Sequence, residues 1–362
     1  MSKAAELAAL IGSQSALSNR NLIINGAMNV AQRATSVASL SSTATYSTCD
    51  RFMVQYGSSG TFTESQSTTA PSGFSNSLKL DCTTADSSPN YLLISQRIEG
   101  QNVQHLKKGT SSAVSTTLSF YVRSSKTGTY QVNLRDIDNT RIIGATYTIS
   151  STDTWEQKII TFAGDTTGAF DNDNAASLDI EWWLASGSTY NSGAVPTAWE
   201  AAANGDRAAG LNVAIGASTS DDFHITGVQL ELGEQATPFE HRSFADELHR
   251  CQRYYAVREN TVGSLKYYSQ ALQAYNTTSV YGVIADYPVT MRATPTVSQS
   301  GTFGAYIASS ANASMPSTIG NLFATSHAWG SGGWTSGSGL VAGNASVMYA
   351  DTNAKLMADA EL

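Results

Sequence analysis

The chain has 362 residues, room for about two domains of ordinary size, and only 14% of its residues are charged. Its net charge is −8, and Lys and Arg form no cluster along the sequence, which excludes the positive surface that a nucleic-acid-binding protein needs. The abundance of Ser, Thr, Gly and Ala, together with 16 tyrosines, is typical of β-rich proteins that work outside the cytosol. No segment approaches the roughly 20 apolar residues of a membrane span, so we expect no membrane insertion.

Residues 2–11 predict a short N-terminal helix that ends at Gly12. Its apolar side chains share one stripe: Leu7, Leu10 and Ile11. Because Glu6 interrupts the short apolar run, the segment is not a signal peptide, and we expect synthesis in a cytoplasm without export by the usual signal. A short apolar helix outside a β domain is either a loose tail or a docking segment, and we interpret residues 1–20 as an attachment segment.

Residues 21–240 contain many short stretches in which apolar and polar side chains alternate, the pattern of half-buried β-strands. The clearest pair is a hairpin, in which residues 118–122 and 130–134 alternate around a turn at residues 124–128. Further strands are expected at 52–56, 77–80, 91–98, 155–162, 178–184 and 223–232. About eight to ten strands at this spacing, without a long helix, predict an antiparallel sandwich of the jelly-roll type.

Near residue 240 the period of the apolar residues changes from two to that of a helix. Gly233 ends the last strand of the first domain, and Ser243 with Asp246 resembles the capping box that begins a helix. The apolar stripe of this helix has four residues at steps of four, three and four: Phe244, Leu248, Cys251 and Tyr255. A helix this short is marginal alone, so we expect residues 241–256 to form a linker helix. Its stripe must pack against a neighbouring domain or against the same helix in other copies of the chain.

Residues 257–362 predict a second, smaller β domain. Strands are expected near 265–268, 279–285 and 296–298, and residues 299–344 are rich in Gly and Ser. The expected fold class is therefore all-β, with two β-sandwich (jelly-roll-like) domains joined by a short helix.

Aromatic residues in Gly- and Ser-rich loops are typical of recognition surfaces, because they offer rigid contact area among adaptable polar groups. We expect receptor contacts in the smaller domain from four residues: Tyr306, His327, Trp329 and Trp334. Trp183 is a fifth candidate, since its phase in the strand is opposite to that of Ile180 and Leu184 and should turn its ring outward. For each ring the alternative is cover by a loop or by a neighbouring subunit.

The sequence offers no catalytic motif. None of the five histidines stands at a zinc-binding spacing, and no nucleophile elbow, Walker or Rossmann glycine pattern occurs. Glu231 and Glu240 are nominal carboxylates for glycoside hydrolysis, but they occupy ordinary strand and turn positions. We therefore expect no catalytic residues and no enzyme.

Two acidic stretches, residues 136–139 and 171–174, carry oxygen ligands at short spacing. Neither has the glycine-bearing twelve-residue loop of an EF-hand, so we interpret both as Asx turns and expect no metal site. The cysteines Cys49, Cys82 and Cys251 are too few for a disulfide framework and lie at no metal-ligand spacing.

An ordered set of motifs runs through most of the chain. In the first domain and the helix they are NLIINGAMNVAQR (21–33), DRF (50–52), TLSFYVRSSKTGTY (117–130), TWEQKIITF (154–162), ITGVQLELGEQATPFE (225–240) and FADELHRCQRYY (244–255). YPVTMRATPTV (287–297) and DAEL (359–362) follow in the second domain. In this order the motifs resemble bacteriophage tail-fibre and related virion proteins, whose first domain is similar to the jelly-roll carbohydrate-binding-module fold.

The resemblance implies a homotrimeric, non-enzymatic virion appendage that attaches the phage to a host-surface glycan or protein. It implies an N-terminus that docks on another virion protein and a distal end that meets the host. In such a trimer the interface is expected to use the two apolar stripes: Leu7, Leu10, Ile11, Phe244, Leu248, Cys251 and Tyr255. No cofactor is expected, although the resemblance leaves room for a structural calcium without assigning its ligands. A head fibre or decoration protein with a purely structural role, and a glycan-binding module or glycosidase, are the alternatives.

Overall fold

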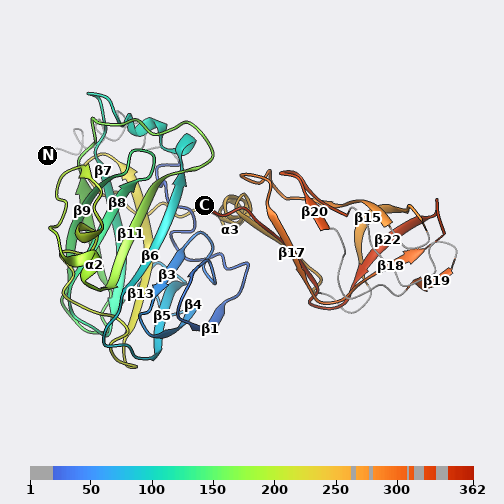
Figure 1. Cartoon of the computed structure of the whole chain (residues 1–362), viewed down its shortest axis with the longest axis horizontal. Helices are drawn as coiled ribbons and strands as arrows, with labels where there is room; N and C mark the ends of the chain where they lie inside the picture. Colours follow the sequence, from blue (N-terminus) through green and yellow to red (C-terminus); the bar gives the residue numbers. More distant parts are fainter. Residues whose placement is uncertain (1–18, 262–265, 277–279, 308–309, 314–321, 332–340) are drawn as a thin grey trace. The chain divides into compact units, whose positions relative to one another are not determined.

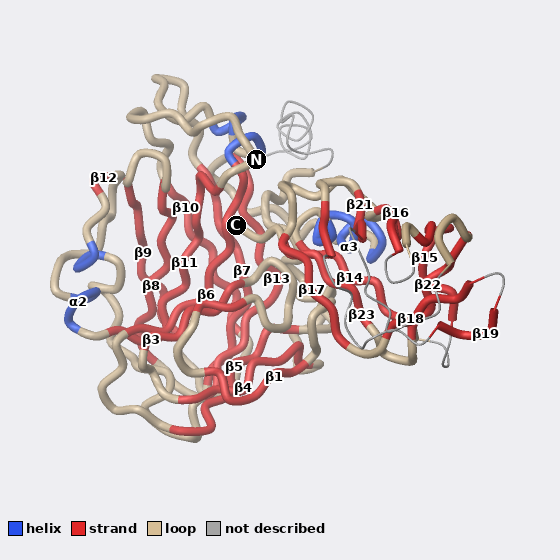
Figure 2. The backbone as a smooth tube through the Cα atoms, turned by 45° about the vertical axis from the view of Figure 1, so that its right-hand side comes forward, coloured by secondary structure: helices blue, strands red, loops and turns tan. Residues whose placement is uncertain are grey.

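The structure is a computed structural model that describes residues 19–261, 266–276, 280–307, 310–313, 322–331 and 341–362. Within these residues strands dominate and every strand pair is antiparallel (Figures 1 and 2). The expected all-β class is thus confirmed. The chain divides into two compact units: a larger unit of the residues up to Glu247 with Leu362, and a smaller unit, Leu248–Glu361.

The larger unit is a sandwich of two sheets. The six-stranded sheet has the order β1 (Ser36–Leu40), β4 (Thr61–Ser67), β5 (Ser77–Thr84), β13 (Asp222–Leu232), β7 (Thr116–Ser124) and β10 (Glu156–Phe162). The seven-stranded sheet has the order β12 (Glu200–Ala201), β9 (Arg141–Ile149), β8 (Gly128–Asp136), β11 (Ala176–Ser186), β6 (Tyr91–Glu99), β3 (Met53–Gly57) and β2 (Ala44–Thr45). From β5 to β8, and again from β9 to β13, successive long strands cross between the two sheets, as in a jelly roll.

The core lies between the inner faces of these sheets, where aromatic rings fill the centre. Trp182 of β11 is fully buried, and its ring centroid lies 5.9 Å from that of Phe120 and 6.4 Å from that of Phe52. Rings of this size bury more apolar area than any aliphatic side chain and so dominate the stability of a sandwich core.

Strand β13 shows how the sequence fits the core despite an interrupted alternation. Phe223 and Ile225 have one phase and Val228 and Leu230 the other, yet all four lie in the core. A bulge reconciles them, because the register on β7 shifts between Thr226 and Gln229. Gly227 lies in this bulge with φ +62°, a left-handed conformation that glycine adopts easily.

The smaller unit holds two further antiparallel sheets. The three-stranded sheet has the order β14 (Tyr255–Glu259), β23 (Lys355–Asp359) and β17 (Thr296–Ser300). The other has the order β19 (Ser310–Ala313), β18 (Phe303–Ile307), β22 (Ala345–Ala350), β15 (Lys266–Ala274), β16 (Val280–Asp286), β21 (Ala328–Ser331) and β20 (Leu322–Ala324). Leu272, Ile284, Met348 and Leu356 are among the buried side chains of its core.

Helix α3 (Phe244–Gln252) begins at the predicted Ser243 cap: Asp246 N donates to Ser243 Oγ at 3.2 Å, and that hydroxyl donates to the Asp246 carboxylate at 2.6 Å. The expectation that Tyr255 continues the helical stripe is wrong. The helix ends at Gln252, and Tyr255 starts β14, where it pairs with β23.

The predicted interface residues have different environments. Cys251 and Tyr255 are buried, Leu248 is half-buried, and Phe244 is 60% exposed. Leu7, Leu10 and Ile11, with the predicted helix at 2–11, lie outside the described residues. Among the described residues, no helix has the length and apolar character that crossing a bilayer requires.

Candidate functional site

The outer face of the seven-stranded sheet carries charged and aromatic side chains at its centre. In β11, Trp182 and its same-phase neighbours face the core, so Asp179, Glu181 and Trp183 face outward. All three are nevertheless buried. Buried carboxylates need partners, and arginines from three segments supply them.

Trp183 points away from the core as predicted, but it is fully buried, so the alternative of a covered ring holds and the proposed receptor contact at Trp183 does not. Its ring packs 5.1 Å from that of Tyr190, in the helix α2 (Ser188–Asn191), and the Arg207 guanidinium lies 4.9 Å from the ring centroid. The segment that follows β11 therefore folds back over the tryptophan. The alternation of apolar and polar residues predicts on which face of the sheet a side chain lies. It does not predict which segment covers that face.

Glu181 is the centre of the charge network. One of its oxygens, Oε1, accepts hydrogen bonds from Arg135 Nη1 at 2.7 Å and Arg207 Nη2 at 2.6 Å, and Trp183 Nε1 donates to Oε2 at 3.0 Å. Burial alone would raise the pKa of Glu181, but Arg207 and Arg135 outweigh it and hold that pKa below its usual range. The neighbouring Asp179 has the opposite balance: burial, and then the charge of Glu181, raise its pKa.

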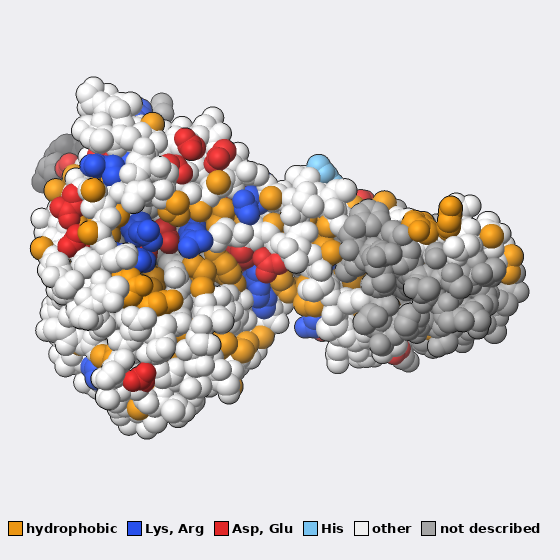
Figure 3. Space-filling model, in the orientation of Figure 1, with side chains coloured by type: hydrophobic (Ala, Val, Ile, Leu, Met, Phe, Trp, Pro, Cys, Tyr) orange, Lys and Arg blue, Asp and Glu red, His pale blue; other side chains and the backbone are white. Residues whose placement is uncertain are grey.

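The arginines are the part of this network that solvent reaches. The side chains of Arg97 in β6 and Arg135 in β8 are 31% and 27% exposed, and both pair with Asp179 in register. Figure 3 shows Lys and Arg side chains gathered near the middle of the larger unit, over β11 and β6, among hydrophobic side chains. Arg97 Nη1 and the Tyr46 hydroxyl both donate, at 3.0 Å, to the main-chain oxygen of Leu362.

A second cluster encloses a buried cation. The Lys108 ammonium, on a side chain 3% exposed, donates to Asp136 Oδ2 and to the carbonyls of Thr167 and Gly168, and it forms an ion pair with Asp165 Oδ2 at 3.0 Å. The rings of Phe170 and Trp199 lie 5.2 and 5.3 Å from the ammonium. Two carboxylates and two carbonyls are the kinds of ligand that calcium takes, and here a lysine of the chain lies among them.

The two acidic stretches adopt turns. Ala175 N donates to Asp173 Oδ1 at 2.9 Å, two residues back, as expected of an Asx turn, and Asn139 N donates to Asp136 Oδ1 at 3.0 Å, three residues back. Asp171 N donates to Asp138 Oδ2, which links the two stretches. Among the described residues, no group of three or more His, Cys, Asp or Glu is arranged to hold a metal.

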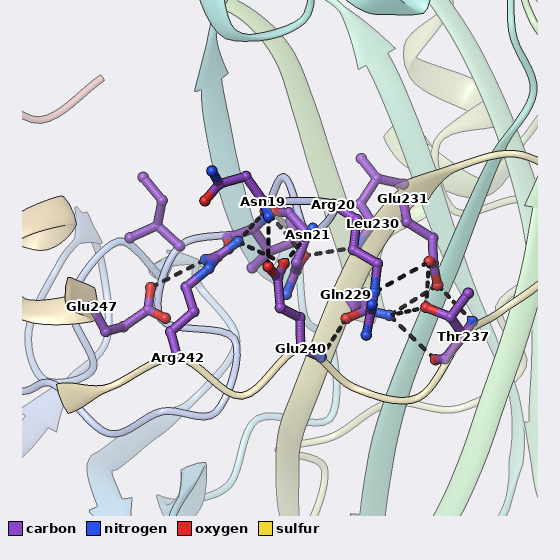
Figure 4. Close-up of polar contacts among 12 residues, drawn as sticks. Asn19, Arg20, Asn21, Gln229, Leu230, Glu231, Thr237, Glu240, Arg242 and Glu247 are labelled. Atoms are coloured by element: carbon purple, nitrogen blue, oxygen red, sulfur yellow. Dashed lines mark hydrogen bonds and ion pairs between the residues drawn. The ribbon is translucent and has the colours of Figure 1, made fainter. Parts of the chain in front are cut away.

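Glu231 and Glu240, the nominal catalytic carboxylates, belong to a network that fastens the segment before the first strand onto β13 (Figure 4). Glu240 accepts hydrogen bonds from the main-chain N–H groups of Asn19 and Asn21, and Glu231 accepts them from the N–H and hydroxyl of Thr237. Burial opposes the charge of Glu240, but the Asn21 N–H and Arg242 lower its pKa. Both carboxylates are thus used in holding the fold together.

The predicted receptor-contact residues of the smaller unit are described only in part. His327 is exposed and its Nδ1 lies 2.9 Å from Ser326 Oγ. Tyr306 lies in β18 and Trp329 in β21, but their side chains, like all of Trp334, lie outside the described residues.

The smaller unit has an exposed aromatic pair that the sequence analysis missed. Tyr275 is 70% exposed and Tyr281 42%, and their ring centroids lie 5.1 Å apart at an interplanar angle of 64°. Val283, two residues along β16, is 45% exposed beside the buried Ile284. The signal was present, since Tyr281 and Val283 share a phase that the buried Val280 and Ile284 do not.

Comparison with known proteins concerns structure alone. No family model matches the sequence, and no curated protein matches it significantly. Similar solved structures include the enzymatically active domain of tailspike protein 4 from bacteriophage CBA120, at 13% identity over 59% of this chain, with a TM-score of 0.30. The match spans 21% of the tailspike chain.

Carbohydrate-binding modules are also similar to part of the chain. The C-terminal family 22 module of Clostridium thermocellum Xyn10B is 10% identical over 52% of this chain and 89% of that chain, with a TM-score of 0.28. TmCBM61, solved in complex with β-1,4-galactotriose, is 8% identical over 59% of this chain and 99% of that chain, with a TM-score of 0.30.

Proposed function

We propose that this chain is a non-enzymatic attachment protein that binds glycans on a host cell surface. The observation that carries the proposal is the exposed pair Tyr275 and Tyr281, with Val283 beside it. The two tyrosines are 70% and 42% exposed, and the apolar face of a sugar packs on exposed aromatic rings while a tyrosine hydroxyl can hydrogen-bond to it. A chain with 14% charged residues suits this mode of contact better than electrostatic capture.

The finer identity rests on the ordered sequence motifs. They support a virion location, as a tail fibre or a head appendage, with three copies of the chain associated and the N-terminal segment docked on another virion protein. Three weak sites that act together on a crowded surface would bind far more tightly than one, because linked sites raise the effective concentration. Attachment therefore requires no single strong pocket.

The non-enzymatic part of the proposal is supported by how the outward carboxylates are used. Asp179 and Glu181 have pKa values shifted in opposite directions, as in an acid and base pair. Both are fully buried, however, and Glu181 is saturated by two arginines and a tryptophan. A glycosidic bond would have to reach them through that network, so we assign them no catalytic role.

The test is binding of the purified full-length chain to an array of bacterial surface polysaccharides and lipopolysaccharide oligosaccharides. We expect reproducible binding to a restricted group of glycans, with no release of reducing sugar from them. Absence of binding to every surface glycan of a host that the phage infects would favour the purely structural decoration role instead.

A further inference from the structure

The row of side chains Arg135, Asp179 and Arg97 crosses three adjacent strands on the outer face of the seven-stranded sheet. Asp179 lies directly opposite Arg135 in one strand pair and opposite Arg97 in the other. Directly opposite residues on one face bring their side chains together, so the two arginines flank one carboxylate from both sides. Arg97 Nε lies 3.4 Å from Asp179 Oδ2.

In this row the negative charges are buried and the positive charges are partly exposed. The carboxylates of Asp179 and Glu181 are 1% and 0% exposed, whereas the guanidinium-bearing side chains of Arg97 and Arg135 are about a third exposed. Arg207, the third arginine, is taken up by Glu181 and by the rings of Trp183 and Tyr190. Solvent at the row therefore meets arginine side chains and not the carboxylates, on a chain whose net charge is −8.

Some polar atoms of the row have no hydrogen-bond partner within the described residues. Among the described residues, Asp179 Oδ1 and Arg135 Nε are buried and have no hydrogen-bond partner. Unpaired buried polar atoms are costly, and in native structures they mark places where a partner is absent. Arg135 Nε is a donor that an oxygen of an anionic group can satisfy, whereas Asp179 Oδ1 is an acceptor that needs a donor such as a sugar hydroxyl.

The row already binds one acceptor oxygen. Arg97 Nη1 and the Tyr46 hydroxyl converge on the oxygen of Leu362, each at 3.0 Å. Two convergent donors, one of them a guanidinium, are the arrangement that holds a carboxylate or phosphate oxygen. A ligand oxygen could take this place or extend the row toward Arg135.

We propose that this face, at Arg97, Arg135 and Tyr46, binds the anionic group of an acidic glycan, either the carboxylate of a sugar acid or a sugar phosphate. This inference rests on the proposed glycan attachment and gives it a second, charge-selective site. Planar guanidinium groups suit both anions, since they can donate two parallel hydrogen bonds. The neutral sugar rings would still pack on the tyrosines of the smaller unit.

Isothermal titration calorimetry on the full chain separates the two anion sources. One arm uses trigalacturonic acid against its carboxyl-reduced form, and the other uses an oligomannoside bearing mannose 6-phosphate against the neutral oligomannoside. We expect one acidic probe to bind about tenfold or more tightly than its neutral counterpart, and less tightly as salt is raised. Equal affinities for acidic and neutral forms in both arms would overturn the proposal.

Substitutions test whether the preference for acidic glycans arises at the row of Arg135, Asp179 and Arg97. Arg97→Gln and Arg135→Gln should each abolish the acidic preference, whereas Arg123→Gln should keep it. Arg123 is a matched control, since it is 20% exposed and pairs with Asp153 and Asp222 on the other sheet. If a glutamine variant fails to fold, Arg97→Lys keeps the charge, loses the paired donors, and should still weaken acidic binding about fivefold. Wild-type preference in the folded Arg97 variants would refute the site.

The Tyr281→Ala variant distinguishes failure of the proposed anionic site from failure of the proposed glycan attachment. It should lose neutral glycan binding and keep the acidic preference. Neutral binding that depends on the tyrosines, with no acidic preference, would leave glycan attachment standing and remove the charge-selective site.

Discussion

Lys108 Nζ lies 3.0 Å from Asp165 Oδ2, and this ion pair forms half of a buried site in which one ammonium holds two carboxylates. Removing the ammonium leaves the buried Asp136 without its cation, whereas Asp165 keeps its ion pair with Arg141 at 2.6 Å. We expect Lys108→Ala to lower the free energy of unfolding by about 3–5 kcal/mol, measured by urea denaturation, because a buried charge left unpaired is strongly destabilising. An effect below about 1 kcal/mol would show that the carboxylates find solvent or other partners.

The same site makes a prediction about calcium. A cavity of about 20 Å³ beside Lys108, lined by Leu106, Phe170 and Trp199 among others, has room for a water molecule, and in Lys108→Ala the position of the lost ammonium is vacant for a cation. Millimolar calcium should therefore recover part of the stability that Lys108→Ala loses and should not stabilise the wild-type chain. The double variant Lys108→Ala, Asp136→Asn is the control and should not respond. A calcium effect of equal size on all three chains would contradict this account.

Glu64 predicts a pH-dependent stability. Burial raises its pKa from 4.5 to about 7, although Thr48 and Tyr56 donate hydrogen bonds to it. A pKa raised by folding gives a contribution that is complete below about pH 4.5 and is lost as pH rises through 7. We expect Glu64→Gln to gain about 3 kcal/mol on the wild type between pH 4.5 and pH 8, by urea denaturation at both pH values.

Glu156 supplies the control of opposite sign. Burial would raise its pKa, but Lys158 and the N–H groups of Ser151 and Ser150 outweigh burial and lower it. Its contribution is present above the unfolded pKa and is lost as pH falls, so Glu156→Gln should cost stability at pH 8 and little at pH 3. If both variants showed the same pH trend, the assignment of Glu64 would be wrong.

Gly227 is expected to be intolerant of a side chain. Its φ of +62° disfavours other residues, and a Cβ there would lie 2.8 Å from the Phe74 ring and 2.9 Å from the Tyr121 ring. Gly227→Ala should therefore destabilise by about 2–4 kcal/mol in thermal or urea unfolding. Gly73→Ala, at φ +93° with no atom within 4 Å, isolates the backbone cost and should lose only about 1 kcal/mol. Similar losses for both would show that the bulge has room.

Much of the fold could be predicted from the sequence, because alternation reports directly on which residues face a core. The strands at 118–122, 130–134, 178–184 and 223–232 follow from it. The predicted hairpin between the first two is wrong, because β7 belongs to the six-stranded sheet and β8 to the seven-stranded sheet, so the chain crosses the sandwich between them. The bulge at Gly227 explains why two phases in one strand both point inward. Tyr255 was misplaced because a step of four fits a helix, and no Gly or Pro stands at residues 253–254 to mark the turn that ends it.

The candidate site was harder to predict, since it depends on contacts between distant residues. Trp183 lies on the outward face that the sequence indicated, but Arg207 and Tyr190 lie over it. No local sequence pattern predicts that these residues cover the ring. The Arg97 and Arg135 row requires the strand order β8, β11, β6, which alternation alone does not give. Exposure of Tyr275 likewise depends on what packs around β15 and β16.

The proposed trimer predicts a sensitive surface at α3. Phe244 is 60% exposed at the start of the helix, and Leu248 follows one turn later on the same stripe. We expect sedimentation equilibrium to give three chains per particle for the wild type and fewer for Phe244→Asp or Leu248→Asp, because a buried aspartate at an interface is left without a partner. Ile159→Asp, at a residue 56% exposed on β10, should remain trimeric. A wild-type chain that sediments as a monomer at micromolar concentration would rule the trimer out.

Glycan attachment through the exposed tyrosines is tested most directly by the double variant Tyr275→Ala, Tyr281→Ala in a quantitative assay of host-cell binding. Ile159→Ala serves as the control, since it removes an exposed apolar side chain from the larger unit. With thermal unfolding unchanged, we predict that the double variant binds cells about tenfold or more weakly than the wild type, while the control binds as the wild type does. Undiminished binding by the folded double variant would contradict the account.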